Sequence, residues 1–273
     1  MSNSDQSLRT GHIDVGNSKI YYETVGTGYP IILIHDGLVD CRVWDEQISY
    51  FAEHYQVIRY DRRGYGKSEP PATDYSNVED LHTLLQFLKI EKASLMGVSA
   101  GGMISIDFTL SHPEMVDALV LVGSDVNGFE GSEHASQRVM SVVKPLLEND
   151  DVEQTIENWC NDPYFVAPEN ITARSKFREF LTTYPHNLYA PHAFSFDEPG
   201  PPAIGRLAEI HVPNLIIVGE EDIPDNHAVS GAIQVGISGS KRVILANAGH
   251  LANLEQSQVF NPLAYEFLES ALQ

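Results

Sequence analysis

The residues most able to do chemistry in this 273-residue chain are a serine, a histidine and an aspartate that lie far apart in the sequence. Ser99 is the centre of Gly97–Gly101, which reads G-V-S-A-G and falls where a predicted buried strand gives way to a helical pattern. Asp222 and His250 each follow a separate predicted strand. A serine hydroxyl becomes a nucleophile when a base takes its proton and an acid orients that base. These three residue types therefore predict nucleophilic catalysis.

The glycines around Ser99 carry more weight than the bare motif, which arises by chance in roughly one chain of this composition in ten. A serine on a strand-to-helix turn takes strained backbone angles, and side chains two residues before and after it would collide with neighbouring backbone. The following helix also points its N-terminus at the reaction centre, where peptide dipoles favour negative charge. From this motif alone, the alternative is a helix-capping serine after a tight turn.

The elements that must position these residues alternate along the chain. A hairpin over His12–Thr24 is followed by strands and helices in turn, which predicts an α/β fold with a mostly parallel sheet covered on both faces. Ligands bind at the carboxyl ends of strands in such sheets, so we expect the three residues to meet at that edge. The predicted strands are Ile31–His35, Val57–Tyr60, Ser94–Val98, Ala118–Val122, Leu215–Val218 and Val243–Ala246, and the predicted helices are Val78–Leu88, Gly101–Leu110, Ala228–Val235 and one that opens at Asn261 and Pro262.

Residues 125–206 interrupt this alternation with no predicted strand and many aromatic side chains. They predict a mainly helical insertion between two parts of one core domain, residues 1–124 and 207–273. The aromatic residues form either the insertion's own core or the walls of an apolar pocket where it meets the sheet. Which side chains of residues 125–206 would contact a substrate stays open.

Attack on a carbonyl carbon also requires two donors for the oxygen that becomes negatively charged. The backbone N–H of Ala100, directly after Ser99, is one candidate. The backbone N–H of Gly37, just beyond the strand that ends at His35, is the other. These two residues are the predicted oxyanion hole.

Two further residues near strand ends have competing interpretations. His35 fits a structural imidazole bonded to nearby backbone better than it fits a catalytic base. Asp125 follows the strand that ends at Val122 and stays an alternative to Asp222 as the acid.

The composition excludes several classes of partner. Lys and Arg number 17 against 38 Asp and Glu, and the net charge of −21 repels phosphate backbones and anionic lipid headgroups. Gly66–Ser68 imitates the end of a phosphate-binding loop, but Asp61 stands where that loop needs its first glycine. We therefore expect a small-molecule substrate and no nucleic-acid or membrane partner.

The first ten residues lack the apolar segment of a signal peptide, so we expect a cytoplasmic protein. Cys41 and Cys160 show no metal-binding spacing and are predicted to be buried apolar residues. Neither a metal nor an organic cofactor is expected. The oligomeric state stays open.

The motifs together resemble those of serine-dependent α/β-hydrolases. Asp61–Ser68 reads D-R-R-G-Y-G-K-S, similar to the D-x-R-G-x-G-x-S turn after the family's fourth strand, and His35–Gly37 stands where the family usually has His-Gly-x. The resemblance runs from about His12 to Leu272 outside the insertion. Within the family, it is closest to small capped esterases and lactonases of the oxoadipate enol-lactonase kind. It implies an α/β-hydrolase fold with an eight-stranded sheet and makes residues 125–206 a helical cap.

The resemblance implies Ser99 as nucleophile, Asp222 as acid and His250 as base. We expect a cofactor-independent serine hydrolase that cleaves a small or medium carboxylic ester or lactone through an acyl-enzyme. A base with an ordinary histidine pKa would make the rate rise through roughly pH 6 to 7. Two alternatives stay open: a hydrolase-like receptor that binds a small ligand with slow turnover, and a hydroxynitrile lyase or perhydrolase that uses the same residues.

The chain departs from the family pattern next to the predicted oxyanion hole. Asp36 replaces the commonest glycine and brings a carboxylate to this loop. Leu38–Asp40 follows in place of the Gly-Pro-Gly continuation typical of proline iminopeptidases and of carbon–carbon bond hydrolases.

Overall fold

The computed structural model describes residues 7–190 and 200–273, and eight strands in these ranges form one sheet. Their spatial order is β1-β2-β4-β3-β5-β6-β7-β8. The pairs β1–β2 and β2–β4 are antiparallel and the other pairs are parallel, so the sheet is mostly parallel, as predicted. The strands span Arg9–Asp14 (β1), Lys19–Val25 (β2), Pro30–Ile34 (β3), Gln56–Tyr60 (β4), Ala93–Val98 (β5), Val116–Val122 (β6), Asn214–Gly219 (β7) and Lys241–Leu245 (β8).

The predicted helices Val78–Leu88 and Gly101–Leu110 are confirmed to within one residue at each end, and the one near Ala228 begins earlier, at Pro224. The helices Asp45–Phe51 and Ala252–Glu255 were not predicted. The C-terminal helix begins earlier than predicted, at Ser257, and contains Pro262. Proline removes a helix hydrogen bond, but tertiary contacts outweigh that loss. Phe260 is fully buried, and Asn261 accepts a 2.7 Å hydrogen bond from Gln47. The helices span Asp45–Phe51 (α1), Asn77–Leu88 (α2), Ala100–Ser111 (α3), Glu133–Asn149 (α4), Val152–Asn161 (α5), Ile171–Thr183 (α6), Pro224–Gly236 (α8), Ala252–Glu255 (α9) and Ser257–Ala271 (α10).

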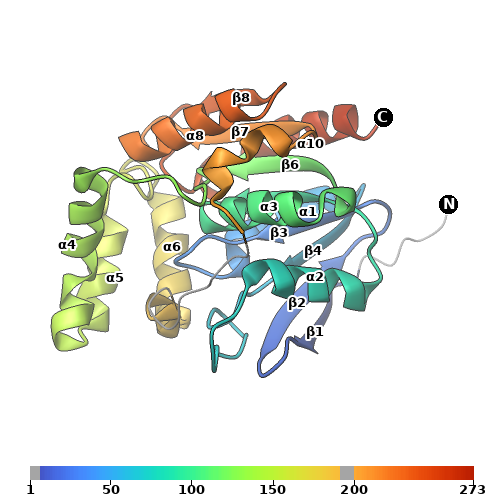
Figure 1. Ribbon diagram of the computed structural model, residues 1–273. Coiled ribbons are helices and arrows are strands. Elements are labelled where there is room, and N and C mark those ends of the chain that lie inside the picture. The colour runs from blue at the N-terminus through green and yellow to red at the C-terminus, as the bar shows by residue number, and fades with distance from the viewer. Residues whose placement is uncertain (1–6, 191–199) are drawn as a thin grey trace.

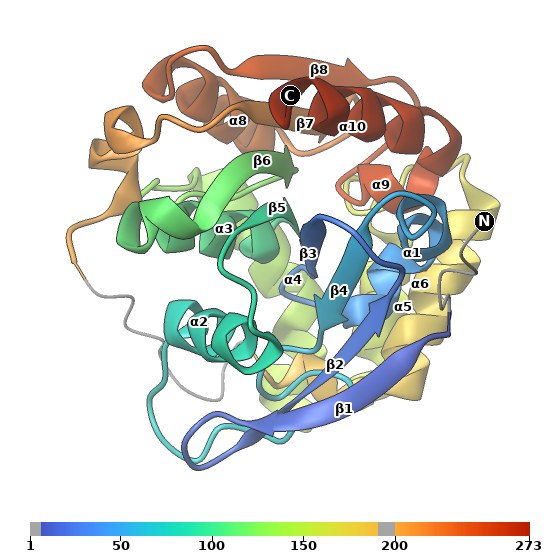
Figure 2. The same ribbon diagram turned by 90° about the vertical axis from the view of Figure 1, so that its right-hand side faces the viewer.

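Alternate side chains of the central strands enter two apolar cores, one on each face of the sheet. In β3, Ile31 and Leu33 belong to the core shared with α1 and α10, whereas Ile32 and Ile34 belong to the core shared with α2, α3 and α8. Figure 2 shows these two helix layers on opposite sides of the sheet. Burial on both faces explains why the central strands read as continuous apolar runs.

Helices α4, α5 and α6 stand apart from these layers, beside one end of the sheet (Figure 1). The described part of residues 125–206 contains no strand, as predicted. Val139 of α4 and Trp159 of α5 line a cavity together with Ser99, which directly follows β5. The helical insertion therefore covers the carboxyl ends of the strands, where the candidate catalytic residues lie.

The turn after β4 is held by the carboxylate of Asp61. Its two oxygens accept hydrogen bonds of 2.8 Å from the backbone N–H groups of Cys41 and Lys67. Gly66 has φ +52°, and a Cβ atom there would lie 2.2 Å from the Asp61 carboxylate, so a side chain does not fit. The D-x-R-G-x-G-x-S motif thus has a structural role, because its aspartate fixes the turn after β4.

The same turn contains a buried ion pair that we expect to stabilise the fold. Arg63 donates to both carboxylate oxygens of Asp80 in α2, at 2.6 and 2.7 Å, and each side chain is 7% exposed. Replacing Asp80 by Asn leaves a buried guanidinium without a counter-charge, so we expect the free energy of unfolding to fall by about 3–5 kcal/mol. Urea denaturation followed by circular dichroism measures this loss.

The exposed pair between Arg178 and Glu157 provides the matched control, because its side chains are 46% and 45% exposed. We expect Glu157→Gln to leave the urea midpoint almost unchanged. Equal midpoints for Asp80→Asn and the unsubstituted protein would contradict the stabilising role of the buried pair.

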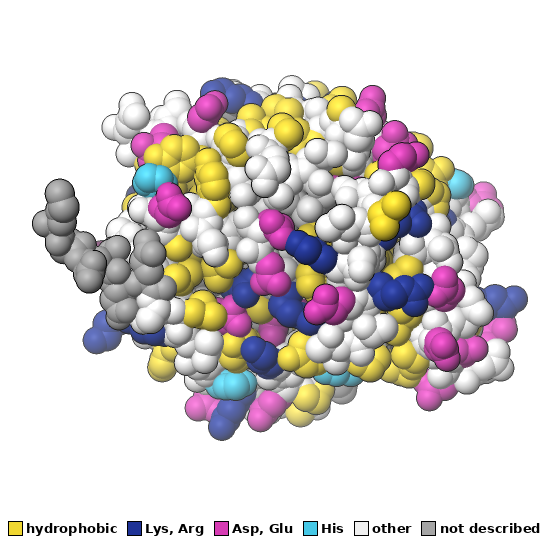
Figure 3. Space-filling view, turned by 180° about the vertical axis from the view of Figure 1, so that it is seen from behind, with side chains coloured by type: hydrophobic (Ala, Val, Ile, Leu, Met, Phe, Trp, Pro, Cys, Tyr) yellow, Lys and Arg dark blue, Asp and Glu magenta, His cyan; other side chains and the backbone are white. Residues whose placement is uncertain are grey.

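Acidic and basic side chains are interspersed on the face shown in Figure 3. Surface charges of the fold also form pairs, such as Lys176 with Glu46. Within residues 7–190 and 200–273, no helix has the length and apolar character needed to cross a membrane. Cys41 and Cys160 are both free and buried, as predicted.

Candidate active site

Ser99 occupies a strained turn between β5 and α3. Its backbone φ is +54°, a conformation that residues other than glycine seldom adopt. A Cβ atom on Gly97 would lie 2.2 Å from the carbonyl oxygen of Gly101, and one on Gly101 would lie 2.2 Å from that of Ile34. The predicted reason for the two glycines is therefore confirmed.

His250 and Asp222 meet at the carboxyl ends of neighbouring strands, His250 after β8 and Asp222 after β7. Nδ1 of His250 lies 3.0 Å from a carboxylate oxygen of Asp222. The other oxygen of Asp222 accepts 2.8 Å hydrogen bonds from the backbone N–H of Ile223 and from the side-chain amide of Asn226. With its Nδ1 proton donated to Asp222, His250 has Nε2 available as a base.

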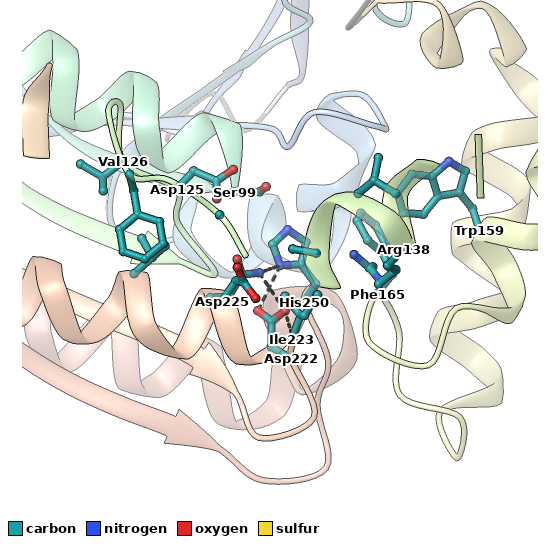
Figure 4. Close-up of a pocket in the computed structure, with 16 residues that line it drawn as sticks. Ser99, Asp125, Val126, Arg138, Trp159, Phe165, Asp222, Ile223, Asp225 and His250 are labelled. Carbon is teal, nitrogen blue, oxygen red and sulfur yellow. Dashed lines mark hydrogen bonds and ion pairs between the residues drawn. The ribbon is translucent and has the colours of Figure 1, made fainter. Parts of the chain in front are cut away.

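Ser99 lines the same cavity as His250 and Asp222, so the structure brings the three predicted residues to one place (Figure 4). No hydrogen bond joins the Ser99 hydroxyl to His250 in the described part of the chain. Catalytic hydrogen bonds of ligand-free hydrolytic sites often tighten only when substrate binds.

Asp125 lies in this cavity as well but makes no side-chain hydrogen bond to His250 or to any other described residue. In Figure 4 its side chain extends towards Ser99, whereas Asp222 lies on the far side of the His250 ring. The hydrogen-bond geometry therefore favours Asp222 over Asp125 as the acid partner of His250.

The predicted oxyanion donors Gly37 and Ala100 lie side by side. A Cβ atom on Gly37 would be 3.7 Å from Cβ of Ala100, in ordinary contact. Ala100 is the first residue of α3, and the N–H groups of a first helical turn have no partner within the helix. Tyr65 donates a 2.9 Å hydrogen bond to the carbonyl of Gly37 and fixes this loop from behind.

Asp36, the departure from the family pattern, shapes the oxyanion loop through its side chain. One carboxylate oxygen accepts hydrogen bonds from the backbone N–H groups of Leu38 and Val39, the latter at 3.0 Å. The other oxygen is buried without a partner, and burial raises the pKa of this carboxyl. Asp36 thus closes a local turn that the usual glycine could not close.

His35 is a structural residue, as predicted. Its Nδ1 donates to the carbonyl of Asp36 at 2.7 Å, and its Nε2 accepts from the backbone N–H of Arg62 at 2.9 Å. Complete burial lowers the pKa of this imidazole well below its ordinary value. Both ring nitrogens are therefore occupied.

Two cavities flank Ser99 and differ in character. The polar cavity has a volume of about 290 Å³ and lies on the His250 side, with Asp125, Asn226 and Arg138 in its wall. The apolar cavity has a volume of about 190 Å³ and lies on the Gly37 side. Its apolar lining comes mainly from the insertion and comprises Leu38, Val139, Val143, Leu146, Trp159, Phe165 and Leu188.

Known proteins share this arrangement of elements. The family model described as the alpha/beta hydrolase fold matches residues 30–257. The chain is an α/β hydrolase. It is 25% identical over 286 residues to 2-hydroxy-6-oxo-6-phenylhexa-2,4-dienoate hydrolase of Comamonas testosteroni, covering 97% of this chain and 96% of that relative.

Two solved structures extend the comparison. Est816, described as an N-acyl homoserine lactone degrading enzyme, is 26% identical with a TM-score of 0.76, covering 94% of this chain and all of that one. The enol-lactonase from Burkholderia xenovorans LB400 is 21% identical with a TM-score of 0.80, covering 95% and 100%. The second likeness is one of fold, and it confirms the predicted similarity to enol-lactonases at that level.

The loop that carries the histidine of this α/β hydrolase is tied to the helical insertion. The backbone N–H of His250 donates to the carbonyls of Tyr164 and Phe165, at 2.9 and 3.1 Å. The rings of Phe165 and His250 also contact each other, with centroids 5.0 Å apart. The insertion therefore helps to position the candidate base as well as covering it.

Glu255 makes a second connection between the same two segments. Its carboxylate accepts a 2.8 Å hydrogen bond from the N–H of Ala167 in the insertion and a 2.9 Å bond from the N–H of Gly249 beside His250. Burial raises the pKa of Glu255 to about 7, although both N–H groups favour its ionised form. The sequence analysis missed Glu255 and Asn226. The signal that could have found them is their proximity in sequence, five residues after His250 and four residues after Asp222.

A buried group of potential metal ligands lies outside this site. Oxygen or sulfur atoms of Asp40, Cys41 and Asp61 lie within 4.8 Å of one another. The Asp61 oxygens are occupied by backbone N–H groups, and Asp40 is paired with Arg42 at 2.7 Å. These partners make the group a hydrogen-bonded core rather than a metal site.

Four carboxyl groups face His250: those of Asp36 after β3, Asp125 after β6, Asp222 after β7 and Glu255 in α9. Burial alone would lower the pKa of His250, but Asp222, assisted by Asp125 and Asp36, outweighs it and raises that pKa to about 9. An ordinary histidine predicts a rate that rises through roughly pH 6 to 7. The raised pKa of His250 shifts this expected rise to higher pH.

We expect kcat/KM for an uncharged ester to rise with pH and to level off above an inflection near pH 9, because the base must lose its proton. The raised pKa of His250 also affects the free energy of unfolding, which falls with rising pH where the rate increases. Since the folded-state pKa exceeds the unfolded value of about 6.5, stability from the protonated His250 is complete below that value and is lost as the pH rises through about 9. A pH–rate profile with an inflection at 6 to 7 would contradict this expectation.

Proposed function

We propose that this α/β hydrolase cleaves carboxylic esters or lactones through an acyl-enzyme, with Ser99 as nucleophile, His250 as base and Asp222 as acid. The observation that carries the proposal is the strained Ser99 turn opening into the cavity where His250 is hydrogen-bonded to Asp222. Hydrolysis by the family supports the general reaction, and the placement of these side chains supports the finer assignment.

In the first half-reaction, Nε2 of His250 takes the hydroxyl proton of Ser99 as Oγ attacks the carbonyl carbon. The backbone N–H groups of Gly37 and Ala100 bind the oxyanion that forms. His250 then gives its proton to the leaving oxygen as the bond to the alcohol breaks. In the second half-reaction, water takes the place of the alcohol, and the same proton transfers release the acid and restore Ser99.

The positions of the two cavities support an assignment of the two halves of the substrate. The leaving oxygen must face His250 to receive a proton, which places the alcohol part in the polar cavity. The acyl part then lies beside Gly37 in the apolar cavity. A volume of about 190 Å³ suits a short chain or a small ring, since a comparable apolar cavity of about 150 Å³ holds benzene.

The charges of the site argue against anionic substrates such as the dienoate in the name of the Comamonas relative. Among described residues, Arg138 is the one lysine or arginine that lines either cavity. Asp162 already binds its guanidinium with two hydrogen bonds, of 2.7 and 2.9 Å. The two undescribed ranges contain no lysine or arginine. A substrate carboxylate would therefore meet Asp125, and the cation that faces it in the described cavity would be His250, which must lose its proton before it can act as base.

The decisive test is hydrolysis of nitrophenyl esters and lactones combined with labelling by a fluorophosphonate. We expect steady turnover to the free acid, and one phosphonyl group per chain on the peptide that contains Ser99. Mass spectrometry locates the label. A labelled residue other than Ser99, or ligand binding without product release, would overturn the proposal and favour the receptor alternative.

Val143 provides a test of the acyl cavity, because it is buried on α4 and lines that cavity. We expect Val143→Trp to fill the space and to lower kcat/KM for nitrophenyl hexanoate by about tenfold or more relative to nitrophenyl acetate. A substitution of Met140, an exposed residue on the same helix, should leave the ratio of the two esters unchanged. A uniform loss for both esters would contradict the assignment of the cavity.

A further inference from the structure

The carboxylate of Asp125 is the one acidic group in the polar cavity that has no assigned task. Asp222 binds His250, and Asp225 accepts hydrogen bonds from the backbone N–H and the hydroxyl of Ser132. Asp125 is held by its backbone, since its carbonyl accepts a 2.7 Å hydrogen bond from Ser124. Its side chain has no hydrogen-bond or ion-pair partner in the described ranges and extends into the cavity towards Ser99 (Figure 4).

Burial raises the pKa of Asp125, and the charge of a protonated His250 opposes that rise. Once His250 has lost this proton to act as base, the described groups around Asp125 offer no compensating charge. Nδ1 of His250 is directed at Asp222, and its Nε2 is required for Ser99. Arg138 lines the cavity but is already paired with Asp162. A role for Asp125 as a second acid for His250 would require a hydrogen bond between the carboxylate and the imidazole ring. The described structure contains no such bond. A partly buried carboxylate without a hydrogen-bond partner favours a cation or a donor supplied by the ligand.

The rest of the cavity wall suits an organic cation. Phe129, Trp159 and Phe165 line the polar cavity together with Asp125. The faces of aromatic rings attract ammonium groups, and quaternary ammonium ions in particular are bound by aromatic side chains. A carboxylate adds a direct charge attraction for such an ion. Asp125 and Phe129 lie on the side of Ser99 that receives the alcohol part of the substrate, whereas Trp159 and Phe165 also line the apolar cavity.

We propose that the polar cavity is a subsite for a cationic leaving group, an amino alcohol or a quaternary ammonium alcohol, whose positive charge pairs with Asp125. This inference rests on the proposed ester hydrolysis and names its substrate class. Esters of such alcohols should react faster than uncharged esters of the same shape.

A second consequence concerns the base. Asp125 is one of the four carboxyl groups that face His250, with Asp36, Asp222 and Glu255. A bound cation offsets the field of Asp125 at the imidazole, which makes His250 easier to deprotonate in the complex. The inflection of kcat should therefore lie at lower pH for a cationic ester than for an uncharged one, whereas kcat/KM reports the free enzyme and should share one inflection.

The test compares acetylthiocholine with 3,3-dimethylbutyl thioacetate, which have the same shape and differ in charge. Both release a thiol that a disulfide reagent detects. At low ionic strength we expect kcat/KM to favour the cationic ester by about ten- to a hundredfold, the size expected for one charge pair at a partly screened site. Asp125→Asn should remove most of this preference. Asp225→Asn, which changes an acid of the same cavity that is already bonded to Ser132, should retain it.

The outcomes separate the inference from the proposed function. Equal kcat/KM for the two esters in the unsubstituted protein, or a preference unchanged by Asp125→Asn, overturns the cation subsite while leaving ester hydrolysis intact. If neither ester is hydrolysed, binding of tetramethylammonium to Ser99→Ala protein still decides, measured by tryptophan fluorescence. Saturable binding that Asp125→Asn weakens at least tenfold supports the subsite, and absence of binding overturns it.

Discussion

Ser99→Ala is expected to lower kcat for a nitrophenyl ester by about four to six orders of magnitude while the protein stays folded. The reason is that alanine cannot form the acyl-enzyme, and the residual rate comes from the oxyanion donors and binding alone. The substitution also removes no buried hydrogen bond of the described structure. Steady-state kinetics, with circular dichroism and a melting curve for folding, measures both parts of the expectation.

Ser105 supplies the matched control, because it lies on α3 as well but is fully buried and donates a 2.8 Å hydrogen bond to the carbonyl of Gly101. We expect Ser105→Ala to retain turnover within about tenfold and to lower stability modestly. Near-normal turnover by Ser99→Ala, once contaminating esterase is excluded by the fluorophosphonate label, would remove Ser99 from the mechanism.

Asp222→Asn is expected to reduce kcat by about four orders of magnitude at a pH above the inflection. An asparagine cannot stabilise the imidazolium that forms during the reaction, and its amide can hold the wrong tautomer of His250. The neighbouring amide of Asn226, 2.8 Å from Nδ1 of His250, adds no negative charge to compensate. The measurement is kcat for an uncharged ester across the pH range.

Asp125→Asn is the control for the choice of acid. We expect it to change the plateau kcat for the same uncharged ester by less than about tenfold and to lower the pH of the inflection, since one negative charge near His250 is lost. If Asp125→Asn abolished turnover and Asp222→Asn did not, the acid would be Asp125.

The sequence predicted those parts of the site that depend on backbone geometry. Gly97 and Gly101 are required by atoms that would overlap, and strand ends place Asp222 and His250 at one edge, so a local pattern carried the information. The functions of Asp36, Asn226 and Glu255 depend on which backbone groups lie opposite them after folding. The predicted start of α10 was wrong for the same reason. Contacts with α1 determine where this helix begins, and the proline within it does not.

The number of carboxyl groups around His250 could not be predicted from the sequence either. Asp36, Asp125 and Asp222 lie in separate segments, and each looks like one acid among 38. Their convergence on one imidazole follows from the parallel order of β3, β6 and β7 relative to the strand before the histidine. The sheet topology therefore contributes to the raised pKa of His250.

The hydrogen bonds from His250 to Tyr164 and Phe165 limit how specificity can change in this protein. A cap joined only through its ends could be exchanged for another as a module, with the catalytic machinery left as it was. Here part of the insertion is hydrogen-bonded to His250, the candidate base. Evolution or engineering can vary α4 and its cavity lining freely, but residues 164–167 must be inherited together with the histidine loop.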